Sequence, residues 1–362
     1  MSQAGDPRRA GKEQADPAAP PAAPGGAGEP AQLLTAYFGE RSRVGGHLLA
    51  DALLDLYAAH EIRASILLRG AQGFGAKHSR RSDRQLTLSE DLPLVAVALD
   101  APERIGELAS QVRALAAPGL LTLERARWAR SPLDRSPDQT GEVKLTVYLG
   151  RHEHVGRTPA FVAACQTLQE HGVGGATVLL GVDGTLHGRR RRARFLARNL
   201  GVPMVIVSVG AYEQYAGGAL EQLAAQLAEP LFTLERVRVC KRDSRVLRAP
   251  HPPAEMALGT RQKLTIVVSE AAHHEHRSVY LELIARLGAA GCAGATALRG
   301  IWGFHGDHAP HGDRLLSLRR RVPVITTAID TPERVAELWP IVDELTSEGG
   351  LVTSELLPPE GS

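Results

Sequence analysis

The sequence contains few aromatic residues, three cysteines and no long apolar run. Aromatic residues make up 4% of its 362 residues, so its cores must consist mainly of aliphatic side chains. Cys165, Cys240 and Cys292 form no Cys-x-x-Cys pair, which argues against a disulfide framework and against a thiolate zinc site. Cys165 falls at an apolar position of a helical pattern and is expected in a core. No apolar run approaches the ~20 residues of a transmembrane helix, so we expect no membrane insertion.

The beginning of the sequence lacks the composition of a folded domain. Residues 1–31 are mostly Ala, Pro, Gly and charged residues. Such a segment cannot bury enough apolar surface to offset its chain entropy, so we predict a disordered tail. It also has no apolar signal core, which favours a cytoplasmic location.

Lysine is scarce as well. The 42 basic and 40 acidic residues give a net charge of +2, which argues neither for nor against a polyanionic partner. Only five of the 42 basic residues are lysines, and the rest are arginines. An Arg bias with abundant Ala, Gly and Pro is typical of a GC-rich genome, so a cluster of arginines is not by itself a binding site.

What the sequence does contain is an internal repeat. Four anchors recur in one order: a β-branched or aromatic run, a glycine 31 residues after its end, a proline that opens an apolar run, and a Thr-x-Glu element. We therefore predict three tandem copies of one domain of about 95 residues. The anchors are Gly70, Gly181 and Gly300, then Pro93, Pro203 and Pro323, then Glu124, Glu235 and Glu355. The predicted organisation is tail 1–31, repeat 1 32–128, linker 129–142, repeat 2 143–241, linker 242–261, repeat 3 262–357 and tail 358–362.

Within each copy the hydrophobic periodicity alternates between strand and helix. The order is strand, helix, strand, long loop, strand, helix, strand, which is the ferredoxin-like βαββαβ plan of the α+β class. Thr158 and Pro159 predict a helix N-cap followed by Pro at the first helical position. The third strand, Leu94 to Leu99, is apolar on both faces, so the sheet face without helices must be covered. With three copies in one chain, we expect the copies to cover one another.

Several motifs resemble a known family. They are an opening strand ending in Tyr-x-Gly, the pattern Gly-Ala-Thr-x-Leu-x-Gly at 175–181 and 294–300, Gly73-Phe74-Gly75, and Leu-Ser-Glu-Asp-Leu-Pro at 88–93. This combination resembles the PII-like family catalogued as domain of unknown function 190. The resemblance implies a ferredoxin-like unit and, by kinship with PII signalling proteins, an intrachain PII-like pseudo-trimer. It also implies effector clefts between repeats beside a mobile loop, here 71–90, 182–200 and 301–321.

The long loops supply the ligand-binding candidates. Each carries a His and an Arg at matched places, and an Arg fork with glycine amides such as those of Gly70, Gly73 and Gly75 is a reasonable anion site. Repeat 2 lacks Phe-Gly after Gly184, which puts its site in doubt. The candidates are Arg69, Gly70, Gly73, Phe74, Gly75, His78, Arg84, Gly181, Gly184, His187, Arg194, Arg299, Gly300, Gly303, Phe304, His308 and Arg314.

Two further clusters offer other chemistry. Imidazoles crowd repeat 3 and are suited to Zn or Cu. Those candidate metal ligands are His273, His274, His276, His305, His308 and His311. The run Arg189 to Arg192 could dock an acidic partner; no aromatic residue interleaves it, so nucleic acid is not favoured.

These patterns favour a non-enzymatic, PII-like regulatory protein that binds a small anionic effector and signals to an unidentified target protein. An adenine nucleotide is the effector that the resemblance implies. No nucleophile motif or matched pair of loop carboxylates points to catalysis, and Glu124, Glu235 and Glu355 are interpreted as structural. Two alternatives remain: a metal-binding protein of CutA-like architecture that uses repeat 3, and a basic adaptor that uses the Arg run of repeat 2.

The predicted organisation has a consequence for the assembly. The two linkers can span tens of ångströms at ~3.3 Å per residue, and tethering raises the effective concentration of the copies to the order of millimolar. We therefore expect a monomer in which the three copies pack together. Light scattering should give the mass of one chain, and a mass near three chains would contradict the prediction.

Overall fold

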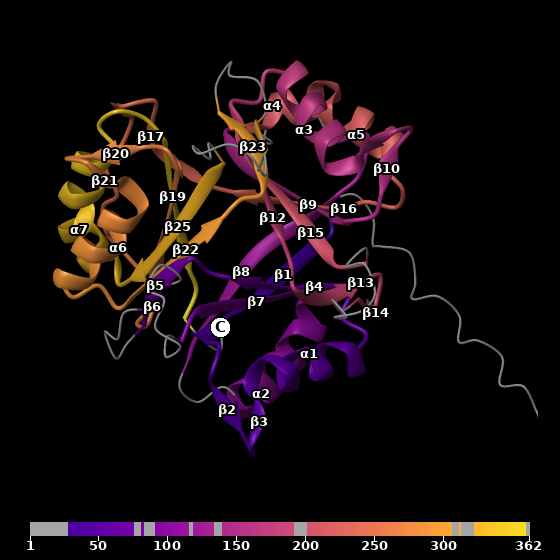
Figure 1. Cartoon of the computed structure of the whole chain (residues 1–362), viewed down its shortest axis with the longest axis horizontal. Coiled ribbons are helices and arrows are strands. Elements are labelled where there is room, and N and C mark those ends of the chain that lie inside the picture. The colour runs from indigo at the N-terminus through magenta and orange to yellow at the C-terminus, as the bar shows by residue number, and fades with distance from the viewer. Residues whose placement is uncertain are drawn as a thin grey trace, which may run out of the picture.

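A computed structural model describes residues 28–75, 81–82, 91–115, 119–133, 140–191, 201–305, 311–312 and 322–359 of the chain. Most of the predicted disordered tail lies outside these residues. Three units surround a common centre, with the helices outside and the strands toward the middle (Figure 1). No helix in the described part of the chain is long and apolar enough to cross a membrane.

The principal elements recur in the same order in each repeat. Repeat 1 contains β1 (Pro30–Gly39), α1 (Leu49–Ala59), β4 (Ala64–Arg69), β7 (Pro93–Asp100), α2 (Pro102–Leu115) and β8 (Leu120–Ala129). Repeat 2 contains β9 (Glu142–Gly150), α3 (Ala160–Glu170), β12 (Gly175–Leu180), β15 (Pro203–Ala211), α4 (Tyr212–Gln214), a π-helix (Tyr215–Ala219), α5 (Leu220–Gln226) and β16 (Leu231–Arg236). Repeat 3 contains β19 (Arg261–Ser269), α6 (Val279–Ala289), β22 (Gly294–Arg299), β25 (Pro323–Asp330), α7 (Pro332–Leu345) and β26 (Leu351–Leu357).

The four long strands of each repeat pair in one antiparallel order. Numbered along the repeat, that order is second, third, first, fourth, as in β4-β7-β1-β8. The helices cover one face of each sheet; in repeat 1, Leu53 of α1 and Leu108 of α2 are fully buried in one cluster with Leu34 and Ala96. This is the alternation of strand and helix that the periodicity predicted.

The second face of each sheet lies in a cluster common to all three repeats. Val95 and Leu99 belong to this cluster, together with Val205 of repeat 2 and Ile325 of repeat 3. Successive residues of β7 alternate between it and the helix-covered cluster, so the strand is buried on both faces. Burial on both faces is the physical reason that the run from Leu94 to Leu99 is entirely apolar.

The helix starts agree with the sequence patterns in part. The second helix begins at Pro102 in repeat 1 and at Pro332 in repeat 3, and Pro is well suited to the first position of a helix. In repeat 2 the helical region that replaces it is kinked at Gly218, where φ is 131°. The predicted N-cap at Thr158 is wrong, because Thr158–Pro159 forms strand β11 and the helix begins at Ala160.

Short hairpins before the first helices were not predicted. Each repeat has one directly after its first strand. They are β2 (Arg43–Val44) with β3 (His47–Leu48), β10 (His154–Val155) with β11 (Thr158–Pro159), and β20 (His273–His274) with β21 (Arg277–Ser278).

The predicted long loops begin with strands that pair with a neighbouring repeat. β5 (Gln72–Phe74) of repeat 1 extends the sheet of repeat 3 beside β22. β13 (Asp183–Leu186) of repeat 2 pairs with β4 of repeat 1, and β23 (Trp302–His305) of repeat 3 pairs with β12 of repeat 2. The exchange is therefore cyclic. Each of these strands turns back through a two-residue strand: β6 (Arg81–Ser82), β14 (Arg189–Arg190) and β24 (His311–Gly312).

Two phenylalanines on these exchanged strands are buried in the cores of the neighbouring repeats. Phe74 of repeat 1 is 4% exposed and lies in the core of repeat 3, where a Cβ on Gly288 would stand 3.2 Å from its ring. Phe304 of repeat 3 lies in the core of repeat 2 in the same way. Each Phe stands opposite an alanine of the neighbouring strand, Ala295 or Ala176.

Repeat 2 replaces this apolar contact with a polar one. Thr185 occupies the place of the missing Phe and is fully buried opposite Ser65 of repeat 1. Its hydroxyl donates to the Ile62 carbonyl (2.7 Å), and its backbone amide donates to Ser65 Oγ (2.9 Å). A Cβ on Gly184 would lie 2.1 Å from the Ser65 carbonyl oxygen, so this approach requires glycine.

The last strands also join the repeats. The end of β8 pairs with β16, so repeats 1 and 2 share one sheet. β17 (Arg238–Arg242) pairs with β26 of repeat 3 and turns back through β18 (Arg245–Val246). Part of the segment 242–261, predicted as a linker, is therefore a strand.

The exchanged phenylalanines should stabilise the chain as much as core residues of a single domain do. Phe304→Ala leaves a cavity in the core of repeat 2, and we expect it to lower the free energy of unfolding by about 3–5 kcal/mol. Urea unfolding of the intact chain measures this change. Leu258→Ala is the control, because Leu258 is fully exposed and should leave the midpoint unchanged. Equal midpoints for the two variants would contradict the role of Phe304.

Candidate functional site

A cleft of about 1200 Å³ lies between repeats 2 and 3. Repeat 2 contributes the beginning of β12 and the end of β17, and repeat 3 contributes the end of β19, the β20–β21 hairpin and strand β23. Gly349 and Gly350 form the turn before β26 at its edge. The cleft thus has apolar strand walls, such as Val267 and Phe304, and polar groups at the loops.

The polar lining combines two basic residues and three histidines with three carboxylates, those of Asp243, Glu270 and Glu348. Arg242 is held by Glu142 at 3.1 Å between Nη2 and Oε2. His305 Nε2 lies 2.7 Å from Asp243 Oδ1, and His273 Nδ1 lies 2.6 Å from the Ala271 carbonyl. Lys144 lines the cleft from the centre of the molecule. Such a lining, with donors from both repeats, suits a small anion that carries an apolar part.

The predicted arginines next to the anchor glycines have local partners. Arg69 Nη2 lies 3.0 Å from Glu40 Oε2, and Arg299 Nε lies 3.0 Å from Glu270 Oε1. Glu270 lines the cleft, so the ion pair between Arg299 and Glu270 lies beside it. Arg69 occupies the matching position in repeat 1.

The predicted glycines serve strand packing. The amides of Gly70, Gly181 and Gly300 donate to the carbonyls of the anchor prolines at 2.8–3.0 Å. The prediction that the Gly70 amide faces an anion is therefore wrong. Gly73 and Gly303 stand where a Cβ would lie 2.7 and 2.3 Å from a carbonyl oxygen of the neighbouring repeat. Gly75 is partly exposed, with nothing within 4 Å of the place of a Cβ.

The remaining loop candidates are placed only in part. Phe74 and Phe304 are buried between repeats, and Phe304 also borders the cleft. His187 stands in the turn between β13 and β14, with φ at 52°. Outside the described residues lie His78, Arg84, Arg194, His308 and Arg314.

Three of the predicted metal ligands line the cleft. They are His273, His274 and His305. His274 Nε2 lies 3.3 Å from Glu344 Oε1, and His276 is exposed in the turn of the hairpin. No group of three His, Cys, Asp or Glu residues suited to a metal ion occurs among the described residues, which include neither His308 nor the side chain of His311.

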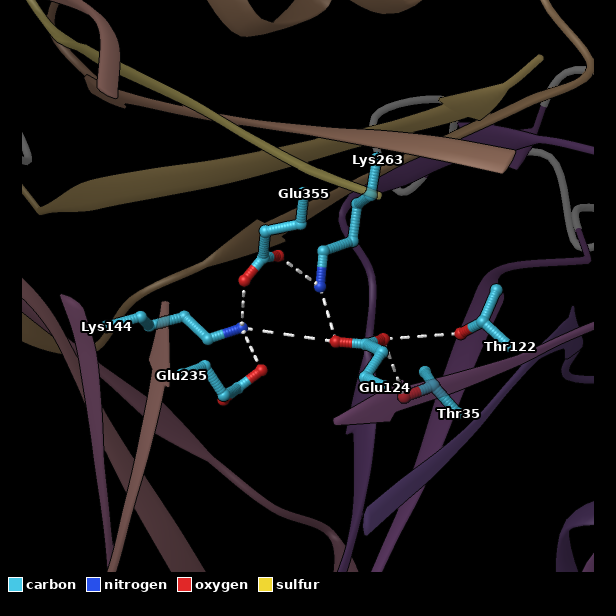
Figure 2. A network of polar contacts seen from close by, with 7 residues as sticks. All are labelled: Thr35, Thr122, Glu124, Lys144, Glu235, Lys263 and Glu355. Carbon is cyan, nitrogen blue, oxygen red and sulfur yellow. Dashed lines mark hydrogen bonds and ion pairs between the residues drawn. The ribbon is translucent and has the colours of Figure 1, made fainter. Parts of the chain in front are cut away.

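A charge cluster at the centre of the molecule was missed at the level of sequence. It consists of Glu124, Lys144, Glu235, Lys263 and Glu355, and we call it the central charge cluster (Figure 2). All five side chains are at least 88% buried, and they come from the first or last strands of the three repeats.

The ammonium groups of the cluster join the repeats. Lys263 contacts Glu355 of its own repeat at 2.6 Å and also pairs with Glu124 of repeat 1. Lys144 contacts Glu235 of its own repeat at 2.7 Å and Glu355 of repeat 3 at 3.2 Å. Thr35 and Thr122 also donate to Glu124, at 3.3 and 3.2 Å.

Position within the cluster decides how each carboxyl titrates. Burial alone would raise the pKa of Glu355, but the two ammonium groups outweigh it and lower that pKa to about 2. The same balance lowers the pKa of Glu124. Glu235 differs, because burial outweighs its one close cation, Lys144, and raises its pKa to about 7.

The sequence did carry a signal for this cluster. The three glutamates match across the repeats, and Lys144 and Lys263 each stand two residues before a matched threonine. They are two of only five lysines in an Arg-rich chain.

Comparison with known proteins adds two findings. A solved structure titled "Crystal Structure of an Unknown Protein from Galdieria sulphuraria" is 15% identical; the match covers 58% of this chain and all of that one, with a TM-score of 0.19. The family model for domain of unknown function 190, described as "Uncharacterized ACR", matches residues 31–128, 142–239 and 261–357. The three tandem copies predicted from the anchors are thereby confirmed. The chain belongs to the domain of unknown function 190 family, with three copies of its domain in one polypeptide.

Proposed function

We propose that the chain is a PII-like signalling protein in which three ferredoxin-like units form a pseudo-trimer within one polypeptide. The strand order second, third, first, fourth in every repeat supports the unit. The cyclic exchange of β5, β13 and β23 supports the threefold arrangement. The shared interior of the three sheets supports it as well.

The effector of this protein is a small anion, with an adenine nucleotide as the first candidate. The observation that carries the proposal is the cleft between repeats 2 and 3, which places Arg242, His273 and His305 around one cavity of about 1200 Å³. A volume of this order accommodates a drug-sized ligand. The apolar strand walls would hold a base or another flat group, and the cationic groups would hold phosphate or carboxylate.

The role is binding and not catalysis. Burial raises the pKa of the Cys165 thiol to about 12 and those of Cys240 and Cys292 to about 11, so these thiols are not thiolate nucleophiles at neutral pH. The cleft arginine pairs with a carboxylate and two of its histidines lie beside carboxylates, contacts that orient these side chains for recognition.

The cleft can be tested with one matched pair of variants. Arg242 lines the cleft, whereas Arg245, its partner in the β17–β18 pair, does not. Loss of a charge-assisted contact costs about 1.5–3 kcal/mol, so Arg242→Ala should weaken binding roughly ten- to a hundredfold, and Arg245→Ala should leave it unchanged.

Calorimetry and thermal shift with ATP, ADP and inorganic phosphate measure this effect on the intact chain. Equal losses in both variants, or no binding of any of the three probes, would contradict the proposal. Zinc and copper salts belong in the same screen. Metal binding that is lost on His305→Ala, without nucleotide binding, would favour the metal-binding alternative.

A further inference from the structure

The central charge cluster follows a pattern that repeat 1 breaks. In each repeat the glutamate of the last strand stands directly opposite a residue of the first strand. Directly opposite residues share one face of a sheet. The opposite residue is Lys144 for Glu235 and Lys263 for Glu355, but it is Leu33 for Glu124. The cluster therefore contains three carboxyl groups and two ammonium groups.

The lysine that repeat 1 lacks leaves Glu235 of repeat 2, and not Glu124 of repeat 1, short of a cation. In its shorter contacts each lysine bridges the glutamate of its own repeat and that of the next repeat in the cycle: Lys263 pairs with Glu124 of repeat 1, and Lys144 pairs with Glu355 of repeat 3. Lys144 also lies 4.0 Å from Glu124, its longest contact in the cluster. A lysine in place of Leu33 would, by the same rule, bridge repeat 1 and Glu235 of repeat 2.

The geometry at Glu235 agrees with this count. Its Oε2 contacts Lys144, whereas its Oε1 is buried and has no hydrogen-bond partner among the described residues. Glu124 lies opposite Leu33, yet it pairs with Lys263 and accepts hydrogen bonds from two threonine hydroxyls. Figure 2 shows Glu235 at the edge of the cluster, joined to it by one contact.

We propose that the Glu235 carboxyl is a proton-binding site at the centre of the chain, and that its proton replaces the missing third ammonium group. A proton on Oε1 removes the unbalanced negative charge from the interior. The packing of the three repeats around the cluster then depends on pH in the neutral range.

The charged surroundings of Glu235 come from every strand that meets there. Lys144 favours its ionised form, and Lys263 does so from farther away. Burial, Glu355 and Glu124 favour the protonated form. Tyr148, from the same sheet, stays neutral because burial raises its pKa. A cavity of about 1040 Å³, lined by all three glutamates, adds Glu255 and three arginines, Arg125, Arg127 and Arg236.

The sign of the pH effect follows from linkage. The pKa of Glu235 is raised from 4.5 in an ordinary carboxyl to about 7 in the folded chain. Between these values the folded state binds more protons than the unfolded state. The contribution of the protonated Glu235 carboxyl to the free energy of unfolding is therefore fully present below about pH 4.5 and is lost as the pH rises through about 7.

The test compares the pH dependence of thermal unfolding between pH 5 and 8 for four intact chains. The wild-type melting temperature should fall with rising pH. Glu235→Gln keeps a neutral side chain, so its melting temperature should fall less with rising pH. It should match that of the wild type near pH 5 and exceed it at pH 8. Leu33→Lys supplies the third ammonium and should also reduce the fall. Glu221→Gln, an exposed position on α5 of the same repeat, should keep the wild-type slope.

The difference between each variant and the wild type carries the result, because the titratable groups that all four chains share contribute equally to each. A ¹³C carboxyl titration by NMR gives a direct readout: the resonance lost in Glu235→Gln should titrate near pH 7 in the wild type. If Leu33→Lys does not fold, Glu235→Gln and the titration still decide. Equal slopes for wild type and Glu235→Gln, or a Glu235 resonance that titrates near 4.5, would overturn the proposal.

Discussion

Each four-stranded sheet of this chain has one face and one edge that its own repeat cannot cover, and the rest of the structure depends on how they are covered. Helices bury only one face, so the apolar residues of the other face must meet the other sheets. The exposed edge of each second strand is completed by a strand from another repeat. Unpaired edges and apolar sheet faces are both costly in water, so the three repeats stabilise one another.

Fusion of the copies has allowed the three junctions to diverge. In a homotrimer any substitution is imposed on all three interfaces at once. Here two junctions use Phe opposite Ala, and the third uses Thr185 opposite Ser65. The Thr-Ser junction satisfies its buried polar atoms with hydrogen bonds, which is the condition under which such a replacement is tolerated. The absence of Phe in repeat 2 is thus a compensated change of interface.

The sequence predicted most of what depends on one repeat alone. The long strands, the first helix of each repeat, the second helices of repeats 1 and 3 and the burial of Leu94 to Leu99 follow from periodicity that is complete within about 95 residues. The strands β5, β13 and β23 could not be found in this way, because three or four residues form a strand there only through a partner in another repeat. The role of Gly70 was misjudged for a related reason: its amide is used by a proline carbonyl 23 residues away. The cluster around Glu235 was interpreted only as structural, because its partners come from three different repeats.

The choice of lysine in the cluster has a physical reason in a chain that otherwise prefers arginine. An ammonium group is a compact charge with three donors, so it can contact two or three carboxylates that converge from different directions, as Lys144 does. A planar guanidinium needs more room and directs its donors in one plane. Lys144 also lines the cleft between repeats 2 and 3, so it belongs to both proposed sites. An anion near this ammonium would weaken its hold on Glu235 and favour the protonated carboxyl, which links the effector and the proton through one side chain.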